Sequence, residues 1–178
     1  VAKQYLKTEN VGAVKSGLAN LRKHIENVRK FGLPVVVALN RFPDDSQDEL
    51  DAIMEFCSSM KAECSLSEVW EKGGEGGIDL AQKLINIIEK KKKSNFRFLY
   101  DTDMSIKAKI STVAVEIYGA DGVLYSKQAL RMIDYLTEKG YGNLPVCMAK
   151  TQYSLSDDPT HMNRPTGFKI TVGDVTLS

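Results

Sequence analysis

Apolar positions recur along the first ninety residues with two different periods, and these predict alternating helices and strands. Steps of three and four residues between Val11 and Val28 predict one long amphipathic helix, which Gly32 and Pro34 would end. The continuous apolar run Val35–Leu39 predicts a strand buried on both faces of a parallel sheet, because such strands lack polar alternation.

The same pattern continues after this strand. Ser46 followed by Glu49 is a capping-box signature that predicts a helix start, residues 62–66 predict a short strand, and residues 78–90 predict another helix. Helix, strand, helix, strand, helix is the order of a doubly wound α/β fold with a mostly parallel sheet flanked by helices. Right-handed crossovers would place both strand exits at one edge, with Asn40 close to residues 67–76.

The second half of the chain repeats the mixture of helices and strands. Helices are expected from Ile106 to about Gly119 and from Leu130 to about Gly140; strands are expected at 96–100, 144–149 and 170–177. A lysine run and Ser94 mark the boundary. We therefore expect one α/β segment over residues 1–93 and a second over 94–178, and we expect the chain to be a piece of a longer polypeptide, truncated at its end.

Composition and charge narrow the function classes. The 178 residues are 43% hydrophobic and 26% charged with a net charge of +1, which is typical of a soluble globular protein and indicates neither a nucleic-acid partner nor a membrane surface. No signal-peptide pattern or spanning apolar run occurs, so a cytoplasmic location is expected. Cys57, Cys64 and Cys147 show no metal spacing, and their apolar flanks predict buried thiols.

Aromatic residues follow two strands of the predicted sheet. Asn40 and Phe42 come directly after the first strand, and Trp70 follows the second. Ligands of open α/β sheets bind outside the carboxyl ends of the strands, so these residues stand where a ligand would be recognised. Two rings at one edge could hold a flat heterocycle between them, although a lone Trp is also often a core residue.

A glycine-rich stretch from Gly73 to Gly77 precedes the helix at 78–90. Free N–H groups at that helix start could hold an anion. The stretch has neither the Gly-Lys-Ser/Thr ending of a phosphate loop nor the Gly-x-Gly-x-x-Gly spacing of a dinucleotide site. A flexible turn and a ligand loop therefore both remain open, and neither a metal site nor a hydrolase nucleophile is indicated.

Six runs of the sequence closely resemble formate–tetrahydrofolate ligases. They cover residues 17–21, 24–27, 34–42, 70–77, 117–122 and 142–154. The resemblance implies a multidomain, P-loop NTPase-like α/β enzyme, commonly a homotetramer. Such enzymes phosphorylate formate with MgATP and transfer the formyl group from formyl phosphate to tetrahydrofolate, giving 10-formyltetrahydrofolate. The resemblance also implies activation by a monovalent cation.

The resemblance assigns roles to individual residues. Phe42 and Trp70 would sandwich the pterin ring, with Leu66 and Pro43 lining the same cleft. The nucleotide side would comprise Asn40, Asp45, Gly73 and Gly74.

No catalytic residue is expected within this chain, because it contains no phosphate loop, and the chain alone should therefore be inactive. Two alternatives remain open: a non-catalytic folate- or nucleotide-binding module, and a segment whose apolar helices form an oligomer interface.

Overall fold

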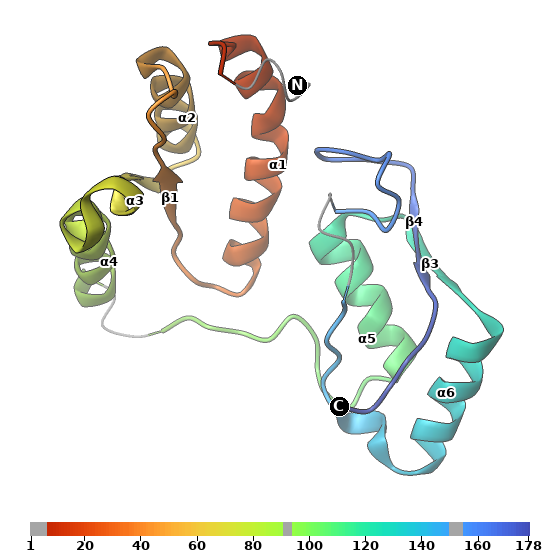
Figure 1. The fold of residues 1–178 in the computed structure, drawn as a ribbon. Coiled ribbons are helices and arrows are strands. Elements are labelled where there is room, and N and C mark those ends of the chain that lie inside the picture. Colours follow the sequence, from red (N-terminus) through yellow and green to blue (C-terminus); the bar gives the residue numbers. More distant parts are fainter. Residues whose placement is uncertain (1–6, 91–93, 150–154) are drawn as a thin grey trace. The chain divides into compact units, whose positions relative to one another are not determined.

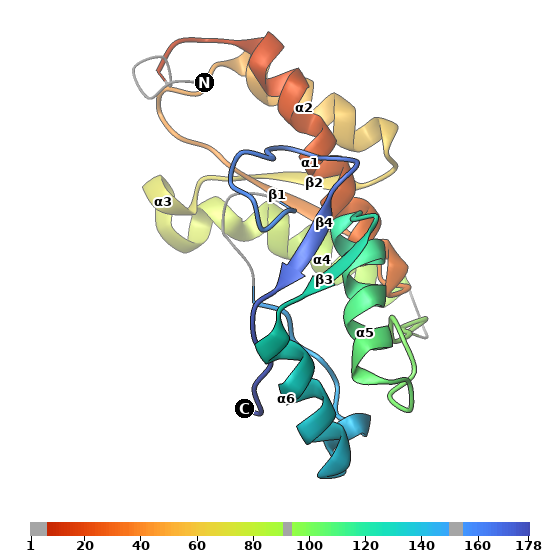
Figure 2. The same cartoon turned by 90° about the vertical axis from the view of Figure 1, so that its right-hand side faces the viewer.

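The chain forms two compact units, and the boundary between them in the sequence lies between Arg97 and Phe98. The computed structural model describes residues 7–90, 94–149 and 155–178, and Figures 1 and 2 show the elements of each unit. Both units are α/β, as the sequence predicts, and the described residues of each contain one pair of parallel strands. The lysines at 91–93, which mark the expected boundary, lie outside the described residues.

The first unit has the predicted alternation of helices and strands. Its elements are α1 (Val11–Lys30), β1 (Val36–Asn40), α2 (Gln47–Ser59), β2 (Glu63–Ser67), α3 (Val69–Lys72), the 3-10 helix η2 (Gly73–Gly77) and α4 (Ile78–Lys90). Strands β1 and β2 run parallel in a register that pairs Val36 with Glu63 and Asn40 with Ser67. The carboxyl ends of the two strands therefore lie side by side.

Local sequence signals account for the ends of these helices. The side chain of Asn10 accepts a hydrogen bond from the backbone N–H of Ala13 at the start of α1. At the start of α2, Ser46 and Glu49 form both bonds of the capping box, which confirms that prediction. Gly32 ends α1 with a φ of 73°, a left-handed conformation that favours glycine.

The prediction that β1 is buried on both faces is wrong. Val36 and Val37 are half-buried, and Ala38 is exposed. Helix α4 contacts both strands, whereas α2 contacts β2 and α1 packs chiefly on α2. Since the sheet of this unit has two strands, β1 is an edge strand and lacks the cover that its apolar sequence suits.

The second unit places two helices beside its strand pair. Its elements are α5 (Ile106–Thr112), the π-helix η3 (Val113–Tyr118), β3 (Gly122–Tyr125), α6 (Lys127–Glu138), the 3-10 helix η4 (Tyr141–Asn143) and β4 (Lys169–Val172). Strands β3 and β4 are parallel. The core gathers side chains of α5 and α6, namely Ile106, Ile110, Ile133 and Leu136.

Two predicted strands of the chain do not form, and β3 lies where no strand was expected. Residues 96–100 form no ladder; the ring of Phe96 instead stacks on that of Phe31 at a centroid distance of 6.3 Å. Residues 144–149 are not a strand because side chains take their backbone groups: the hydroxyl of Tyr100 bonds both the N–H and the C=O of Val146.

Candidate functional site

The site lies at the carboxyl ends of β1 and β2, as the order of elements predicts. Asn40 pairs with Ser67 in the last rung of the ladder, and the N–H of Arg41 donates to the carbonyl of Ser67 at 2.9 Å. The two strands thus stay together one residue beyond β1. This pairing confirms that Asn40 lies beside the segment that begins at residue 67, and it brings the following aromatic residues close to each other.

Phe42 and Trp70 form an exposed pair of rings at this edge. Their centroids lie 6.3 Å apart with an interplanar angle of 52°, and the two residues are 51% and 72% exposed. Of the other residues expected around the pterin ring, Leu66 is half-buried near the end of β2 and Pro43 is exposed directly after Phe42. Large exposed aromatic residues that meet at a strand exit are typical of a binding surface.

The geometry of the two rings is that of a pair in mutual contact. A flat ring stacked between two others needs parallel planes with centroids about 7 Å apart, because each stacked contact takes about 3.5 Å. At 6.3 Å and 52° the Phe42 and Trp70 rings instead touch each other at a tilt. To hold a heterocycle between them, the rings have to rotate toward parallel.

Asp45 closes the turn that carries Phe42. Its Oδ2 accepts a hydrogen bond from the N–H of Phe42 at 2.8 Å, and its own N–H donates to the carbonyl of Phe42 at 3.1 Å. The bond between backbone groups makes a β-turn over residues 42–45, and the side chain of Asp45 closes it from the far end. The carboxylate of Asp45 therefore fixes the backbone at Phe42, a role that the sequence did not suggest.

Glu68 connects the segments that follow β1 and β2. Its Oε1 pairs with Nη1 of Arg41 at 3.1 Å, and its Oε2 pairs with Nζ of Lys72 at 2.6 Å. The hydrogen bond from Lys72, together with that from Arg41, holds the pKa of Glu68 below its usual value. The sequence alone did not indicate this network. The pattern that could have done so is an Arg directly before Phe42 together with a Glu two residues before Trp70.

The glycine stretch is a short 3-10 helix packed on the backbone of Glu68. The N–H of Glu68 donates to the carbonyl of Gly76 at 3.0 Å. A Cβ atom added to Gly76 would lie 2.4 Å from the backbone C and O of Glu68, so only glycine fits there.

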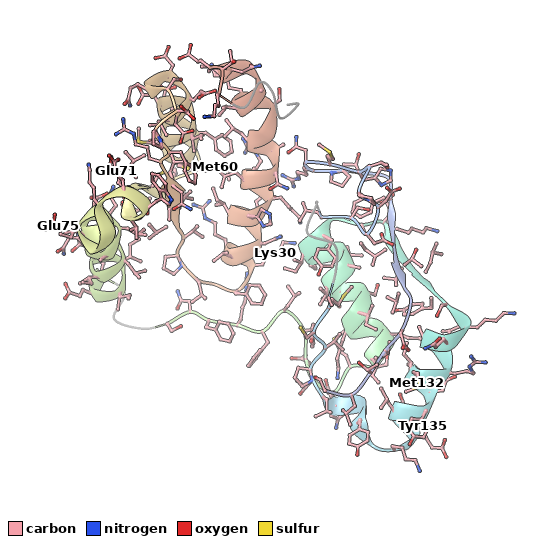
Figure 3. The ribbon with its side chains drawn as sticks, viewed as in Figure 1. Lys30, Met60, Glu71, Glu75, Met132 and Tyr135 are labelled. Carbon is pink, nitrogen blue, oxygen red and sulfur yellow. The ribbon has the colours of Figure 1, made fainter. Side chains whose placement is uncertain are left out.

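The two glycines expected on the nucleotide side differ from Gly76. Gly74 has open space around it, and Gly73 has a φ of 60°. Figure 3 shows Glu71 and Glu75 projecting away from the strands.

The expectation of free N–H groups at the start of α4 is only partly met. The N–H of Gly73 donates to the carbonyl of Val69, and the N–H of Ile78 donates to the carbonyl of Glu75. Continuous helical bonding from α3 through η2 takes these amides, since a helix start has free donors only where no turn precedes it. Anion binding there depends on the remaining amides, among them that of Gly74.

Polar contacts between β2 and α4 anchor this helix beneath the candidate site. The hydroxyl of the fully buried Ser65 donates to Asp79, and Nζ of Lys83 bonds Asp79 at 2.8 Å and the carbonyl of Cys64 at 2.7 Å. These bonds from Lys83 and Ser65 lower the pKa of Asp79. They hold the first turn of α4, and with it η2, against β2.

The cysteines differ from one another in burial. Cys57 is fully buried, and desolvation raises the pKa of its thiol to about 12. Cys64 is half-buried, whereas Cys147 is exposed. The prediction that all three thiols are buried is thus wrong for Cys147, because the segment 144–149 does not form the expected buried strand.

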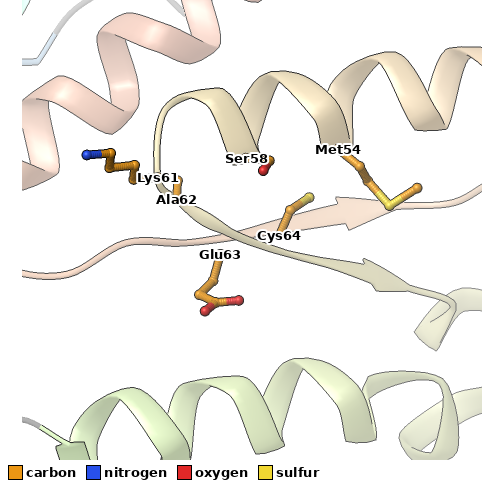
Figure 4. Close-up of a pocket in the computed structure, with 6 residues that line it drawn as sticks. All are labelled: Met54, Ser58, Lys61, Ala62, Glu63 and Cys64. Carbon is orange, nitrogen blue, oxygen red and sulfur yellow. The ribbon is translucent and has the colours of Figure 1, made fainter.

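A hollow of about 450 Å³ lies at the other end of β2 from the aromatic pair. Figure 4 shows the residues that line it, and Cys64 is among them. The full lining is Met54, Ser58, Lys61, Ala62, Glu63 and Cys64.

Within residues 7–90, 94–149 and 155–178, no three His, Cys, Asp or Glu side chains gather closely enough to hold a metal ion. The described helices include none with the length and apolarity that crossing a membrane requires.

Comparison with known proteins gives the family. A family model described as formate–tetrahydrofolate ligase matches residues 1–178. The match spans both units and includes the exposed aromatic pair and the glycine stretch. The chain therefore belongs to the formate–tetrahydrofolate ligase family.

Proposed function

We propose that this chain forms the tetrahydrofolate-binding part of an enzyme that joins formate to tetrahydrofolate with ATP hydrolysis. The reaction proceeds through formyl phosphate and gives 10-formyltetrahydrofolate. Family membership supports the ligase class. The observation that carries the assignment to this site is the exposed pair of Phe42 and Trp70, 6.3 Å apart at the carboxyl ends of two parallel strands.

Phe42 and Trp70 bind the two faces of the pterin ring in this proposal. The rings rotate from their tilted contact toward parallel, and Leu66 and Pro43 contribute the apolar walls. Each ring–ring contact adds about 0.5–1.5 kcal/mol beyond the burial of area. A tetrahydrofolate whose pterin is held in one orientation also brings its N10 amine, on the bridge beyond the pterin, to formyl phosphate with less loss of rotational freedom, which is how positioning lowers a barrier.

The nucleotide side of the proposed site lies around the turn after β1 and the glycine stretch. We assign to it Asn40, at the exposed end of β1, together with Asp45, Gly73 and Gly74. Asp45 already accepts the N–H of Phe42, so a base-reading role would use its other oxygen. We place the phosphate contacts of a P-loop NTPase-like context outside this chain, which has no Gly-Lys-Ser or Gly-Lys-Thr. No residue here is assigned to Mg²⁺ or to a monovalent cation.

Titration of the Trp70 emission with tetrahydrofolate tests the proposal. Trp70 is the sole tryptophan of the chain, so stacking on it quenches the whole indole signal. Phe42→Ala should raise the Kd about 2- to 12-fold, the equivalent of one lost aromatic contact. Phe98→Ala is the matched control, because Phe98 is 77% exposed in the other unit and should leave the Kd unchanged.

Free tryptophan titrated in parallel corrects for light absorbed by the folate. Unquenched Trp70 in folded protein at saturating tetrahydrofolate would argue against the site. Equal effects of Phe42→Ala and Phe98→Ala would show that the change in emission arises elsewhere.

A second function is supported by the outer face of α4. Its aliphatic side chains are 47–63% exposed, although the opposite face of the helix packs on β2. They are Ile78, Leu84, Ile85 and Ile88. Such a stripe favours an oligomer interface. Sedimentation velocity of wild type and Ile85→Lys tests it: the variant should dissociate, and two identical sedimentation profiles would dismiss this role.

A further inference from the structure

The Arg41–Glu68 ion pair links the two segments that carry the aromatic rings. Arg41 directly precedes Phe42 after β1, and Glu68 follows β2, two residues before Trp70. Nη1 of Arg41 lies 3.1 Å from Oε1 of Glu68, and the Glu68 side chain is 21% exposed. The Arg41 side chain is 42% exposed, so the pair is a solvent-accessible ion pair whose value lies in joining two segments rather than in a large energy.

The backbone of Glu68 is held on both sides, so its side chain is a fixed point. Its N–H donates to the carbonyl of Gly76 at 3.0 Å, and its own carbonyl accepts the N–H groups of Glu71 at 3.1 Å and Lys72 at 2.9 Å. The backbone of Glu68 therefore gives its side chain a defined place from which to pair with Arg41. The second carboxylate oxygen pairs with Lys72 at 2.6 Å within the same segment, and this bond does not join the two segments.

Arg41 is the partner whose orientation Glu68 sets. The bond from the N–H of Arg41 to the carbonyl of Ser67 fixes where this residue lies. The side-chain pair with Glu68 is a second tie, which joins Arg41 to the segment after β2. The direction in which the chain continues to Phe42, and hence the position of its ring, depends on this second tie.

We propose that Glu68 is a positioning residue that, acting through Arg41, sets the separation of the Phe42 and Trp70 rings. For its effect on ligand affinity, the inference rests on the proposed function. For the geometry of the free protein, it stands by itself. Asp45 shapes the turn at Phe42 internally, and Glu68 aligns that turn with the segment that carries Trp70.

Three variants distinguish the Arg41–Glu68 pair, which joins the two segments, from the Lys72–Glu68 pair, which lies within one segment. Glu68→Gln keeps the shape of the side chain and removes its charge, and Arg41→Met removes the other partner. Lys72→Met is the control, because Lys72 and Glu68 lie four residues apart in one segment and do not join it to Phe42. Nuclear Overhauser effects between the Phe42 ring and the Trp70 indole report the ring geometry, and Trp70 emission gives the Kd for tetrahydrofolate.

Glu68→Gln and Arg41→Met should each weaken the nuclear Overhauser effect between the two rings and raise the Kd for tetrahydrofolate about two- to five-fold. The double variant should show no further weakening of either. Lys72→Met should leave the ring signal as in wild type. Glu68→Gln with an unchanged ring signal overturns the inference while the proposed function stands. If wild type binds no tetrahydrofolate, the proposed function fails, and the ring signals of the free variants still decide the role of Glu68.

Discussion

Replacement of Gly76 by alanine is the most direct perturbation of the packing that holds Trp70. A Cβ at this position would meet the backbone C and O of Glu68 at 2.4 Å and the N of Val69 at 2.8 Å. An ordinary contact needs about 3.5 Å, so η2 and the backbone of Glu68 have to separate by about 1 Å. The atoms in the way belong to the backbone, and no side chain can rotate to relieve the clash.

Forced overpacking of this kind costs about 1–3 kcal/mol of folding free energy. Gly74→Ala is the matched control two residues away in the same 3-10 helix, where an added Cβ meets no atom within 4 Å. That substitution should be neutral or stabilise by up to about 1 kcal/mol, because alanine lowers the entropy of the unfolded chain. Gly76→Ala should thus lose stability, whereas Gly74→Ala should lose none.

Urea denaturation followed by Trp70 emission measures the difference, since this residue reports on the first unit alone. With an m-value of about 2 kcal/mol/M, a loss of 2 kcal/mol lowers the midpoint by about 1 M. Circular dichroism at 222 nm checks that the folded baselines agree. A Gly76→Ala midpoint equal to or above that of Gly74→Ala would refute the argument that backbone contact excludes a side chain here.

Three other predictions follow from buried or charged groups. At pH 8 a disulfide reagent should modify the exposed Cys147 first and leave Cys57, with its pKa of about 12, unmodified until denaturant is added; site-resolved mass spectrometry identifies the order. Lys109→Met should destabilise the second unit by about 1–3 kcal/mol in thermal melts, because the buried ammonium bonds two backbone carbonyls of residues 142 and 144 that would lose their partner. The hydrogen bonds from Lys83 and Ser65 lower the pKa of Asp79, so the stability it contributes is present above the usual pKa of 3.8 and is lost as the pH falls from there through the lowered pKa of the folded state. Asp79→Asn should therefore melt below wild type at pH 7, and the difference should shrink as the pH falls below 3.8; equal melting temperatures at pH 7 would contradict this.

The first unit was predictable because its signals are local. The capping box at Ser46 and the apolar run before Asn40 each fix an element from a few neighbouring residues. Parallel pairing then follows from the alternation of elements, and with it the meeting of the strand ends.

The second unit shows where local signals fail. The apolar run at 144–149 suits a strand, but the Tyr100 hydroxyl and the buried Lys109 bond the backbone of residues 142–146 instead. Both partners are at least 33 residues away in the sequence. Strand β3 has only four residues, and its pairing with β4 is equally non-local.

The sequence predicts that Phe42 and Trp70 lie at one edge of the sheet, but it does not indicate the contacts that hold them there. The rings of Phe42 and Trp70 are unusual residues at polar strand exits, so they attract attention on their own. Glu68 and Arg41 are ordinary charged residues whose role depends on meeting across two strands. The close approach of Gly76 to Glu68 likewise depends on three-dimensional packing that a run of glycines does not specify.

Intermolecular nuclear Overhauser effects between bound tetrahydrofolate and the labelled chain test the central claim most directly. The account predicts contacts from the protons at C6 and C7 of the reduced pterin to the rings of both Phe42 and Trp70 in one complex. It also predicts that the effect between these two rings weakens on binding, as they part from their 6.3 Å contact. Bound tetrahydrofolate with contacts to neither ring would contradict the account.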